Sequence, residues 1–147
     1  MSDAPKELQG IAGELHHVAI VVRSLEAARP AWEALGLVCG EPEFVEDQDV
    51  NVLVCSIAGQ RIELVEPASD SSPVSRFLEK RGPGLHHLAF EVTDCVAAID
   101  AARARGLELI DEAPRPGSHG TTIAFLHPRA TGGVLCELVE DPPSAAN

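Results

Sequence analysis

The sequence predicts an α+β fold in which two βαβββ modules form one open, curved mixed sheet, a cup, with helices on its outside. The first observation behind it is a pair of histidines before an apolar run, which occurs twice, as LHHVAIVV at 15–22 and LHHLAFEV at 85–92. The second is that both halves close on similar strands, RIELVEP at 61–67 and LCELVEDP at 135–142. One such half cannot bury its sheet alone, whereas two halves can share one.

The two halves also share their internal spacing. In each half the second histidine lies nineteen residues before the glycine that ends the following helix, His17 before Gly36 and His87 before Gly106. A chain of 147 residues has the length of one ordinary domain. The expected divisions are a flexible N-terminus at 1–13, a single domain at 14–140 (module one at 14–67, a linker at 68–83 and module two at 84–140), and a flexible C-terminus at 141–147.

In module one, the strand at 15–22 is followed by a helix that begins after the cap residue Ser24 and ends before Gly36. Pro30 lies inside this helix pattern and is expected to bend the helix or to end its first turn early. The β-branched and apolar residues at 50–57 indicate a strand.

The linker is expected to hold a short helix, with Pro73 near its start and Gly82 near its end. In module two, Thr93 or Asp94 is the expected cap of the helix that follows the histidine-bearing strand. The segment 121–127 reads as a further strand.

The cysteines show no C-x-x-C spacing. Neither a disulfide framework nor a zinc site of thiolates is therefore expected. Cys55 and Cys136 fall inside strand patterns, where cysteine usually behaves as a small buried hydrophobe. The complete set is Cys39, Cys55, Cys95 and Cys136.

The formal net charge of −12 speaks against nucleic acid as a partner, since nucleic-acid binders gain affinity by neutralising phosphates. It also speaks against an anionic membrane surface. No apolar run approaches the roughly 20 residues that cross a bilayer. The start MSDAPKELQG lacks the basic and apolar segments of a secretory signal, so the cytoplasm is the expected compartment.

Alternation of side chains along a strand assigns the histidines to faces. His17 shares a face with Ala19, and His87 shares a face with Ala89; these small alanines leave room in a concavity. His16 and His86 are expected on the opposite face, where they would cap or support the strands.

Glu63 and Glu137 alternate with apolar neighbours in the two closing strands, so each should point to the same side as the second histidine of its module. A carboxylate or an imidazole inside a concave sheet carries a desolvation cost unless it is paired or coordinated. The duplication places His17, Glu63, His87 and Glu137 around one point. Two imidazoles and two carboxylates suit a six-coordinate divalent ion with two open positions.

The sequence resembles the vicinal oxygen chelate (glyoxalase/bleomycin resistance/dioxygenase) superfamily, whose paired βαβββ modules form a cup around a metal. The resemblance covers about residues 14–140. It is strongest in the segments HHVAIVV, IELVEPASDSSPVSRFLEKRGPGLHHLAFEV and GSHGTTIAFLHPRATGGVLCELVE. Within the superfamily, the chain is most similar to the methylmalonyl-CoA epimerase family.

This resemblance implies a metal-dependent enzyme that interconverts (R)- and (S)-methylmalonyl-CoA by α-proton abstraction and reprotonation through a metal-stabilised enolate. It implies a small-molecule acyl-CoA substrate and a homodimer. The expected ion is Co²⁺ or Mn²⁺, with Mg²⁺, Ni²⁺ and Zn²⁺ as alternatives. The implied metal ligands are the four reached from the face assignment: His17, Glu63, His87 and Glu137.

A two-base mechanism needs a proton carrier on each face of the enolate. Glu137 is expected to be one of them. Some family members have a glutamate where this chain has Val52, so the second carrier stays open between Glu91, Asp47, Asp49 and a water molecule.

The loop RPGSHGTT resembles the glycine-bearing loop that lies beside the site in the family. Its glycines would permit close approach of backbone to ligand. The candidate substrate contacts in this loop are Arg115, Gly117, His119 and Gly120.

Three alternatives remain at this point. Glyoxalase I resembles the pattern in its four ligands and its proton transfer on a glutathione adduct. Extradiol dioxygenases need only two histidines and one carboxylate around iron, so Glu63 counts against them. A metal-free small-molecule binding module would share the cup but lack the ligand set.

Overall fold

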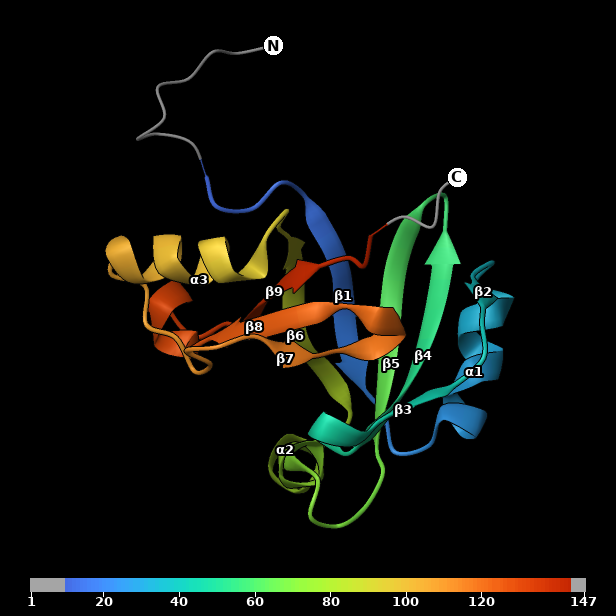
Figure 1. The fold of residues 1–147 in the computed structure, drawn as a ribbon. Helices are drawn as coiled ribbons and strands as arrows, with labels where there is room; N and C mark the ends of the chain where they lie inside the picture. The colour runs from blue at the N-terminus through green and yellow to red at the C-terminus, as the bar shows by residue number, and fades with distance from the viewer. Residues whose placement is uncertain (1–9, 144–147) are drawn as a thin grey trace.

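The computed structural model describes residues 10–143 and forms one curled, open mixed sheet (Figure 1). Module one contains β1 (Leu15–Val21), α1 (Leu25–Ala34), β2 (Val38–Cys39), β3 (Glu43–Val45), β4 (Val50–Ile57) and β5 (Gln60–Pro67). Helix α2 (Pro73–Arg81) occupies the linker. Module two contains β6 (Gly84–Glu91), α3 (Cys95–Ala104), β7 (Arg115–Pro116), β8 (Thr122–Leu126) and β9 (Cys136–Glu140).

The strand order shows the duplication directly. The sheet runs β2-β4-β5-β1-β6-β9-β8-β7, and β3 pairs with β4 beside this path. The central strands β1 and β6 are antiparallel to each other, whereas each is parallel to the closing strand of its own module, β5 or β9. The predicted α+β cup is confirmed. The outer strand of module one is split into the short pieces β2 and β3, so this module has one strand more than predicted.

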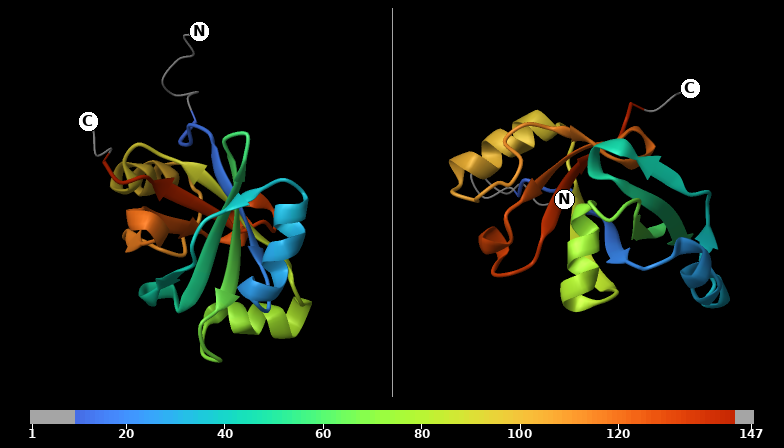
Figure 2. Two further views of the ribbon diagram at one scale, coloured as in Figure 1. Left: turned by 90° about the vertical axis from the view of Figure 1, so that its right-hand side faces the viewer. Right: turned by 90° about the horizontal axis from the view of Figure 1, so that it is seen from below.

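Helices α1 and α3 lie on the outside of the two ends of the sheet (Figures 1 and 2). The expected caps are present, because Ser24 and Asp94 each accept a hydrogen bond from a backbone N–H in the first turn, at 3.1 Å. Glu66 and Glu140, at matching places in β5 and β9, accept the N–H of the first residue of α1 and α3. A carboxylate at a helix N-terminus also complements the helix dipole. Each module thus ties its helix to its closing strand in the same way.

The bulky strand residues pack beneath these helices, as the alternation predicts. Val22 and Leu64 lie in the cluster under α1, while Val92 and Leu138 lie in the cluster under α3. Pro30 lies within the ten-residue helix α1. Burial of these apolar side chains is the main stabilising contribution to the fold.

Both chain ends include residues that the structure does not describe, namely 1–9 and 144–147. Just inside them, the backbone N–H of Gly13 donates to the carbonyl of Glu91 at 2.8 Å, and Ile11 packs against the cluster under α3. At the other end, Asp141 hydrogen-bonds to His16. Most of the residues predicted to be flexible therefore lie outside the described part of the chain, and residues 10–13 and 141–143 lie inside it.

The cysteines require a correction. Cys39 of β2 and Cys55 of β4 lie opposite each other in the strand register and form a disulfide. A sequence spacing rule does not detect such a pair, because the two residues come together through strand pairing rather than through a short loop. Cys95 and Cys136 are free and buried, and Cys136 lies in the core as expected.

Among the residues that the structure describes, no helix has both the length and the apolar character that crossing a membrane requires.

Candidate metal site

Strand register brings the four predicted side chains to the same face of the sheet. Residues that pair across neighbouring strands form two rows. One row crosses β5, β1 and β6, and the other crosses β1, β6 and β9. The middle residue of each row is an alanine with no exposed surface, and its small side chain leaves space above it. The two rows are Glu63–Ala19–His87 and His17–Ala89–Glu137.

Three of these side chains meet at the bottom of the cup. Glu137 Oε1 lies 3.4 Å from His17 Nε2 and 3.3 Å from His87 Nε2. Potential ligand atoms of the three residues all lie within 4.8 Å of one another, and all three residues are buried. The cluster unites both modules, because β1 supplies one histidine while β6 and β9 supply the other two groups.

The two Nε2 atoms of this cluster fit a cation. Within residues 10–143, His17 Nε2 and His87 Nε2 are buried and have no hydrogen-bond partner. An unpaired buried polar atom costs about 1–3 kcal/mol. Imidazole nitrogens and a carboxylate oxygen are ligands that divalent transition metals accept. The donor set and its two unpartnered nitrogens therefore fit a divalent metal ion.

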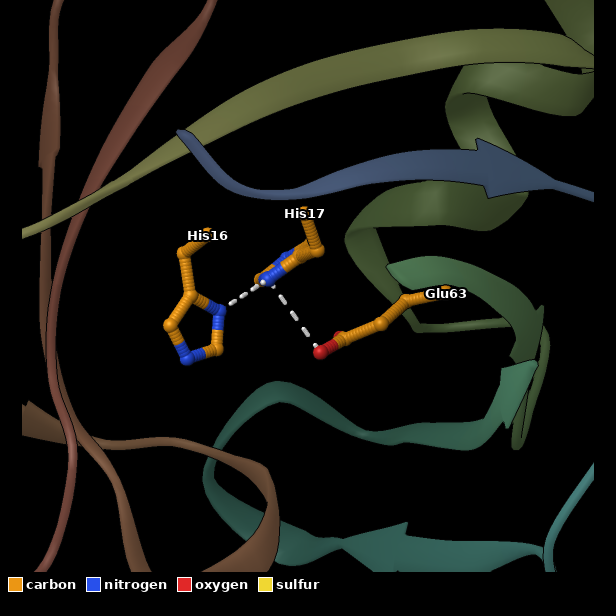
Figure 3. A group of neighbouring side chains, drawn as sticks. All are labelled: His16, His17 and Glu63. Carbon is orange, nitrogen blue, oxygen red and sulfur yellow. Dashed lines mark hydrogen bonds and ion pairs between the residues drawn. The ribbon is translucent and has the colours of Figure 1, made fainter. Parts of the chain in front are cut away.

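Glu63 approaches His17 from the other side of the ring. Its Oε2 lies 3.2 Å from His17 Nδ1, and it forms a second group with His16 and His17 (Figure 3). The structure thus gathers His17, His87 and Glu137 in one cluster and places Glu63 against its edge. The predicted fourth ligand, Glu63, therefore lies beside the three-residue cluster and not within it.

The two carboxylates have opposite electrostatic environments. Burial alone would raise the pKa of Glu137, but His17 and His87 outweigh it and hold this pKa at about 2. Burial raises the pKa of Glu63 to about 7, because the nearby charges of His17 and Arg61 only partly offset it. Near neutral pH, Glu137 is ionised, whereas Glu63 carries a proton for a substantial fraction of the time.

The predicted face of His16 and His86 was wrong. Both line the cavity, and in each pair the two Nδ1 atoms lie 2.8 Å apart. The pairing of β1 with β6 skips one residue in each strand, first His16 and then His86, so each is the extra residue of a β-bulge. A bulge interrupts the alternation of side chains and can redirect one of them.

The environment of His86 differs from that of His16. Its ring meets Phe77 edge-to-face, with centroids 5.0 Å apart. Burial and, to a smaller extent, the nearby charge of His87 lower the pKa of His86 to about 4. His86 is therefore neutral at physiological pH.

A cavity of about 250 Å³ opens above the cluster. Its polar floor contains the histidines and the two glutamates, and its walls are mostly apolar. Valines of module one face β-branched and aromatic residues of module two, and Val52 is part of the wall, as expected for its position. The principal wall residues are Val50, Val52, Val65, Val74, Ile123 and Phe125.

The three candidate second acids lie at different places. Asp47, in the 3₁₀ turn Glu46–Gln48, pairs with the cavity residue Arg115 at 2.8 Å (Oδ2 to Nε). Asp49 accepts a hydrogen bond from Ser69 away from the cavity wall. Glu91, at the end of β6, lies beside Asp141 rather than above the metal cluster. None of the three lines the cavity, and Asp47 is the one paired with a residue that does.

The glycine loop lines the cavity in part. Arg115 and Gly117 form part of its wall, whereas Gly120 and His119 do not. A Cβ atom on Gly117 would lie 2.5 Å from Thr121 Oγ1 and 2.8 Å from Ile123 Cγ2, so glycine is required there. The His119 ring lies outside the cavity, 3.1 Å from Glu43 (Nδ1 to Oε1).

These contacts join the modules across the cavity mouth. Module one supplies Asp47, Glu43 and Gln48, and module two supplies the loop around Arg115 and His119. Gln48 Nε2 also donates to a loop carbonyl at 3.3 Å. Sequence reasoning did not identify Gln48, His16 or His86 as cavity residues, and the repeated His-His pair was the one signal for the histidines.

Comparison with known proteins agrees with the fold. The model of the Glyoxalase/Bleomycin resistance protein/Dioxygenase superfamily matches residues 16–125, and the chain belongs to this superfamily. An ethylmalonyl-CoA/methylmalonyl-CoA epimerase of Cereibacter sphaeroides is 39% identical over 129 residues, covering 86% of this chain and 96% of that protein. The uncharacterized protein YqjC of Bacillus subtilis is 44% identical over 127 residues, covering 86% and 91%.

A solved structure of methylmalonyl-CoA epimerase in complex with methylmalonyl-CoA and NH₄⁺ superposes with a TM-score of 0.85. It is 32% identical in sequence, and the match covers 90% of this chain and 96% of that one. The predicted relationship to the superfamily and to its methylmalonyl-CoA epimerases is thereby confirmed.

Proposed function

We propose that this protein is a metal-dependent epimerase that interconverts the R and S forms of methylmalonyl-CoA. The observation that carries the proposal is the buried cluster of His17, His87 and Glu137, with two unpartnered Nε2 atoms at the floor of a cavity. Two of the proteins named above support the choice of substrate, because the Cereibacter sphaeroides relative carries an epimerase name and the solved epimerase structure holds methylmalonyl-CoA.

His17, His87 and Glu137 would hold the metal, and Glu63 would complete the ligand set by turning from His17 Nδ1 toward it. When bound, a divalent cation supplies Lewis-acid stabilisation of the negative charge that develops on the thioester oxygen. The apolar walls exclude water from this charge, which strengthens each electrostatic contact inside the cavity.

Glu137 is the proposed proton carrier on one face of the substrate. Its second carboxylate oxygen can take up the α-proton, because the side chain is ionised and lies at the cavity floor. Asp47 is the proposed carrier on the other face. It is held by Arg115 at the cavity rim and belongs to the opposite module from Glu137.

Other features follow from the same proposal. Co²⁺ or Mn²⁺ is the proposed ion, since a mixed set of imidazoles and carboxylates accepts either. A homodimer is proposed in keeping with the family resemblance, and a cytoplasmic location is proposed in keeping with the bacterial relatives. Arg115 and the backbone at Gly117 are the proposed substrate contacts, because both line the cavity.

Two assays separate this proposal from its alternatives. The purified protein is incubated with (R)-methylmalonyl-CoA in D₂O, and inversion and α-deuteration are followed; in parallel it is given methylglyoxal with glutathione. Epimerisation that is lost on chelation and restored by Co²⁺ supports the proposal. Turnover of the glutathione adduct alone would identify a glyoxalase-type enzyme, and tight ligand binding without metal or turnover would identify a binding module.

A further inference from the structure

A chain of hydrogen-bonding groups leads from the proposed metal site to the surface. His16 Nδ1 lies 2.8 Å from His17 Nδ1, and His16 Nε2 lies 2.8 Å from Asp141 Oδ1 (Figure 3 shows the histidine pair). The His16 and His17 side chains are each 4% exposed, whereas that of Asp141 is 41% exposed. The chain therefore starts at a buried imidazole and ends at a carboxylate in contact with solvent.

The chemistry of these groups determines where the ring protons lie. An ionised carboxylate can only accept a hydrogen bond, so its partner, His16 Nε2, must carry a proton. A neutral His16 then has a bare Nδ1, which accepts a hydrogen bond from the Nδ1–H of His17. His17 in turn keeps a bare Nε2, which has no hydrogen-bond partner in the structure although Glu137 Oε1 lies 3.4 Å away.

Arg61 favours the opposite arrangement. Its Nη1 lies 2.6 Å from the same His16 Nε2, and a guanidinium can only donate. A hydrogen bond from Arg61 would leave His16 Nε2 bare and put the proton on His16 Nδ1. His17 Nδ1 would then be the acceptor, and its Nε2 would carry a proton that blocks a metal.

We infer that Asp141 and His16 are positioning residues that fix His17 in the tautomer whose Nε2 faces the metal. The inference rests on the proposed metal site. Hydrogen bonds to the distal nitrogen of a liganding histidine commonly set its tautomer and orientation. Here the bond is relayed through a second imidazole.

The relay is built on the histidine pair of module one and is not repeated at the pair of module two. His86 and His87 repeat the 2.8 Å contact between Nδ1 atoms, but the His86 ring packs against Phe77. Among residues 10–143, no carboxylate lies within ion-pair distance of the His86 ring. Asp141 comes directly after β9, the strand that carries Glu137, so the segment that supplies one ligand also orients another.

Nuclear magnetic resonance on the metal-free protein tests the tautomer without any variant. Long-range ¹H–¹⁵N spectra of the histidine rings should show His17 with its proton on Nδ1 and His16 with its proton on Nε2. A proton on His17 Nε2 would overturn the inference. This result does not depend on epimerase activity.

Titration with Co²⁺ then tests the role of Asp141. Asp141→Asn should weaken Co²⁺ binding about tenfold, and Asp141→Glu should restore most of it. Glu14→Gln, which removes an equal charge that like Asp141 lies near Glu91, should bind within twofold of the unmodified protein. Arg61→Gln should bind Co²⁺ at least as tightly as the unmodified protein. Equal losses in Asp141→Asn and Glu14→Gln would overturn the inference, as would a loss in Arg61→Gln alone.

A double-mutant cycle shows whether Asp141 acts through His16. In a His16→Phe background, Asp141→Asn should cause no further loss beyond twofold, because residues of one network are not additive. A second tenfold loss in that background would contradict the relay. If the unmodified protein binds no Co²⁺ at all, the proposed function fails, while the tautomer spectra still decide the inference.

Discussion

His17 and Glu137 lie 3.4 Å apart, Nε2 to Oε1, although they belong to opposite modules of the duplicated chain. The two residues flank Ala89 of β6, since His17 pairs with it from β1 and Glu137 pairs with it from β9. This relationship explains why the site needs both modules. Each half alone pairs one imidazole with one carboxylate, but only the two halves together supply both histidines of the cluster.

Replacing Glu137 by glutamine should abolish epimerisation and deuterium exchange at the α-carbon. The amide keeps the shape of the side chain but loses the negative charge that lies between His17 and His87. Exchange is measured by ¹H NMR of the recovered thioester. The exposed Glu79→Gln variant is the matched control and should keep full activity; undiminished exchange in Glu137→Gln would remove Glu137 from its role.

Replacing Asp47 by asparagine should separate exchange from inversion. If Asp47 serves one face, its loss stops epimerisation, while the enantiomer whose α-proton faces Glu137 still exchanges with solvent. Asp49→Asn, two residues away and bonded to Ser69, should behave as the unmodified protein. Equal epimerisation rates in the two variants would contradict the assignment of Asp47.

Metal affinity should fall as the pH is lowered from 8 to 6. Burial raises the pKa of Glu63 to about 7, and a proton on this carboxylate competes with the ion. Calorimetric titrations in buffers of different ionisation enthalpy should show proton release on Co²⁺ binding near pH 6. This release should vanish in Glu63→Gln. A pH-independent affinity would show that Glu63 takes no part in binding.

The same raised pKa affects the stability of the metal-free protein. A proton on Glu63 stabilises the folded state, so this contribution is fully present below pH 4.5 and is lost as the pH rises toward 7. Glu63→Gln should therefore raise the free energy of unfolding at pH 8 by on the order of 2–3 kcal/mol, with no gain at pH 4. Urea unfolding in the presence of a chelator measures both values.

Substituting Gly117 by alanine should disturb the cavity rather than unfold the protein. The added methyl group would meet Thr121 and Ile123 below 3.0 Å and shift the loop, an effect typically of about 1–3 kcal/mol. We expect KM for the acyl-CoA to rise severalfold. Gly40→Ala is the control, because its Cβ would meet its nearest neighbour at 3.8 Å. Unchanged kinetics in Gly117→Ala would mean that this loop does not touch the substrate.

The period-two alternation of strands was sufficient to place His17, Glu63, His87 and Glu137 on one face, because burial depends on register. Alternation failed at His16 and His86, since a bulge adds one residue without leaving a mark in local composition. The Cys39–Cys55 disulfide and the contacts of Arg115 were not predicted, for a related reason. They depend on which strands become neighbours and on how two loops meet, and neither is encoded in spacing along the chain.

The most direct test of the account is pulsed electron paramagnetic resonance of the Mn²⁺-loaded protein, with ¹⁵N-histidine labelling. The account predicts two directly coordinated imidazoles, of which one is lost in His17→Ala and the other in His87→Ala. A bound Mn²⁺ without coupled histidine nitrogen, or one whose signal is unchanged in both variants, would contradict it.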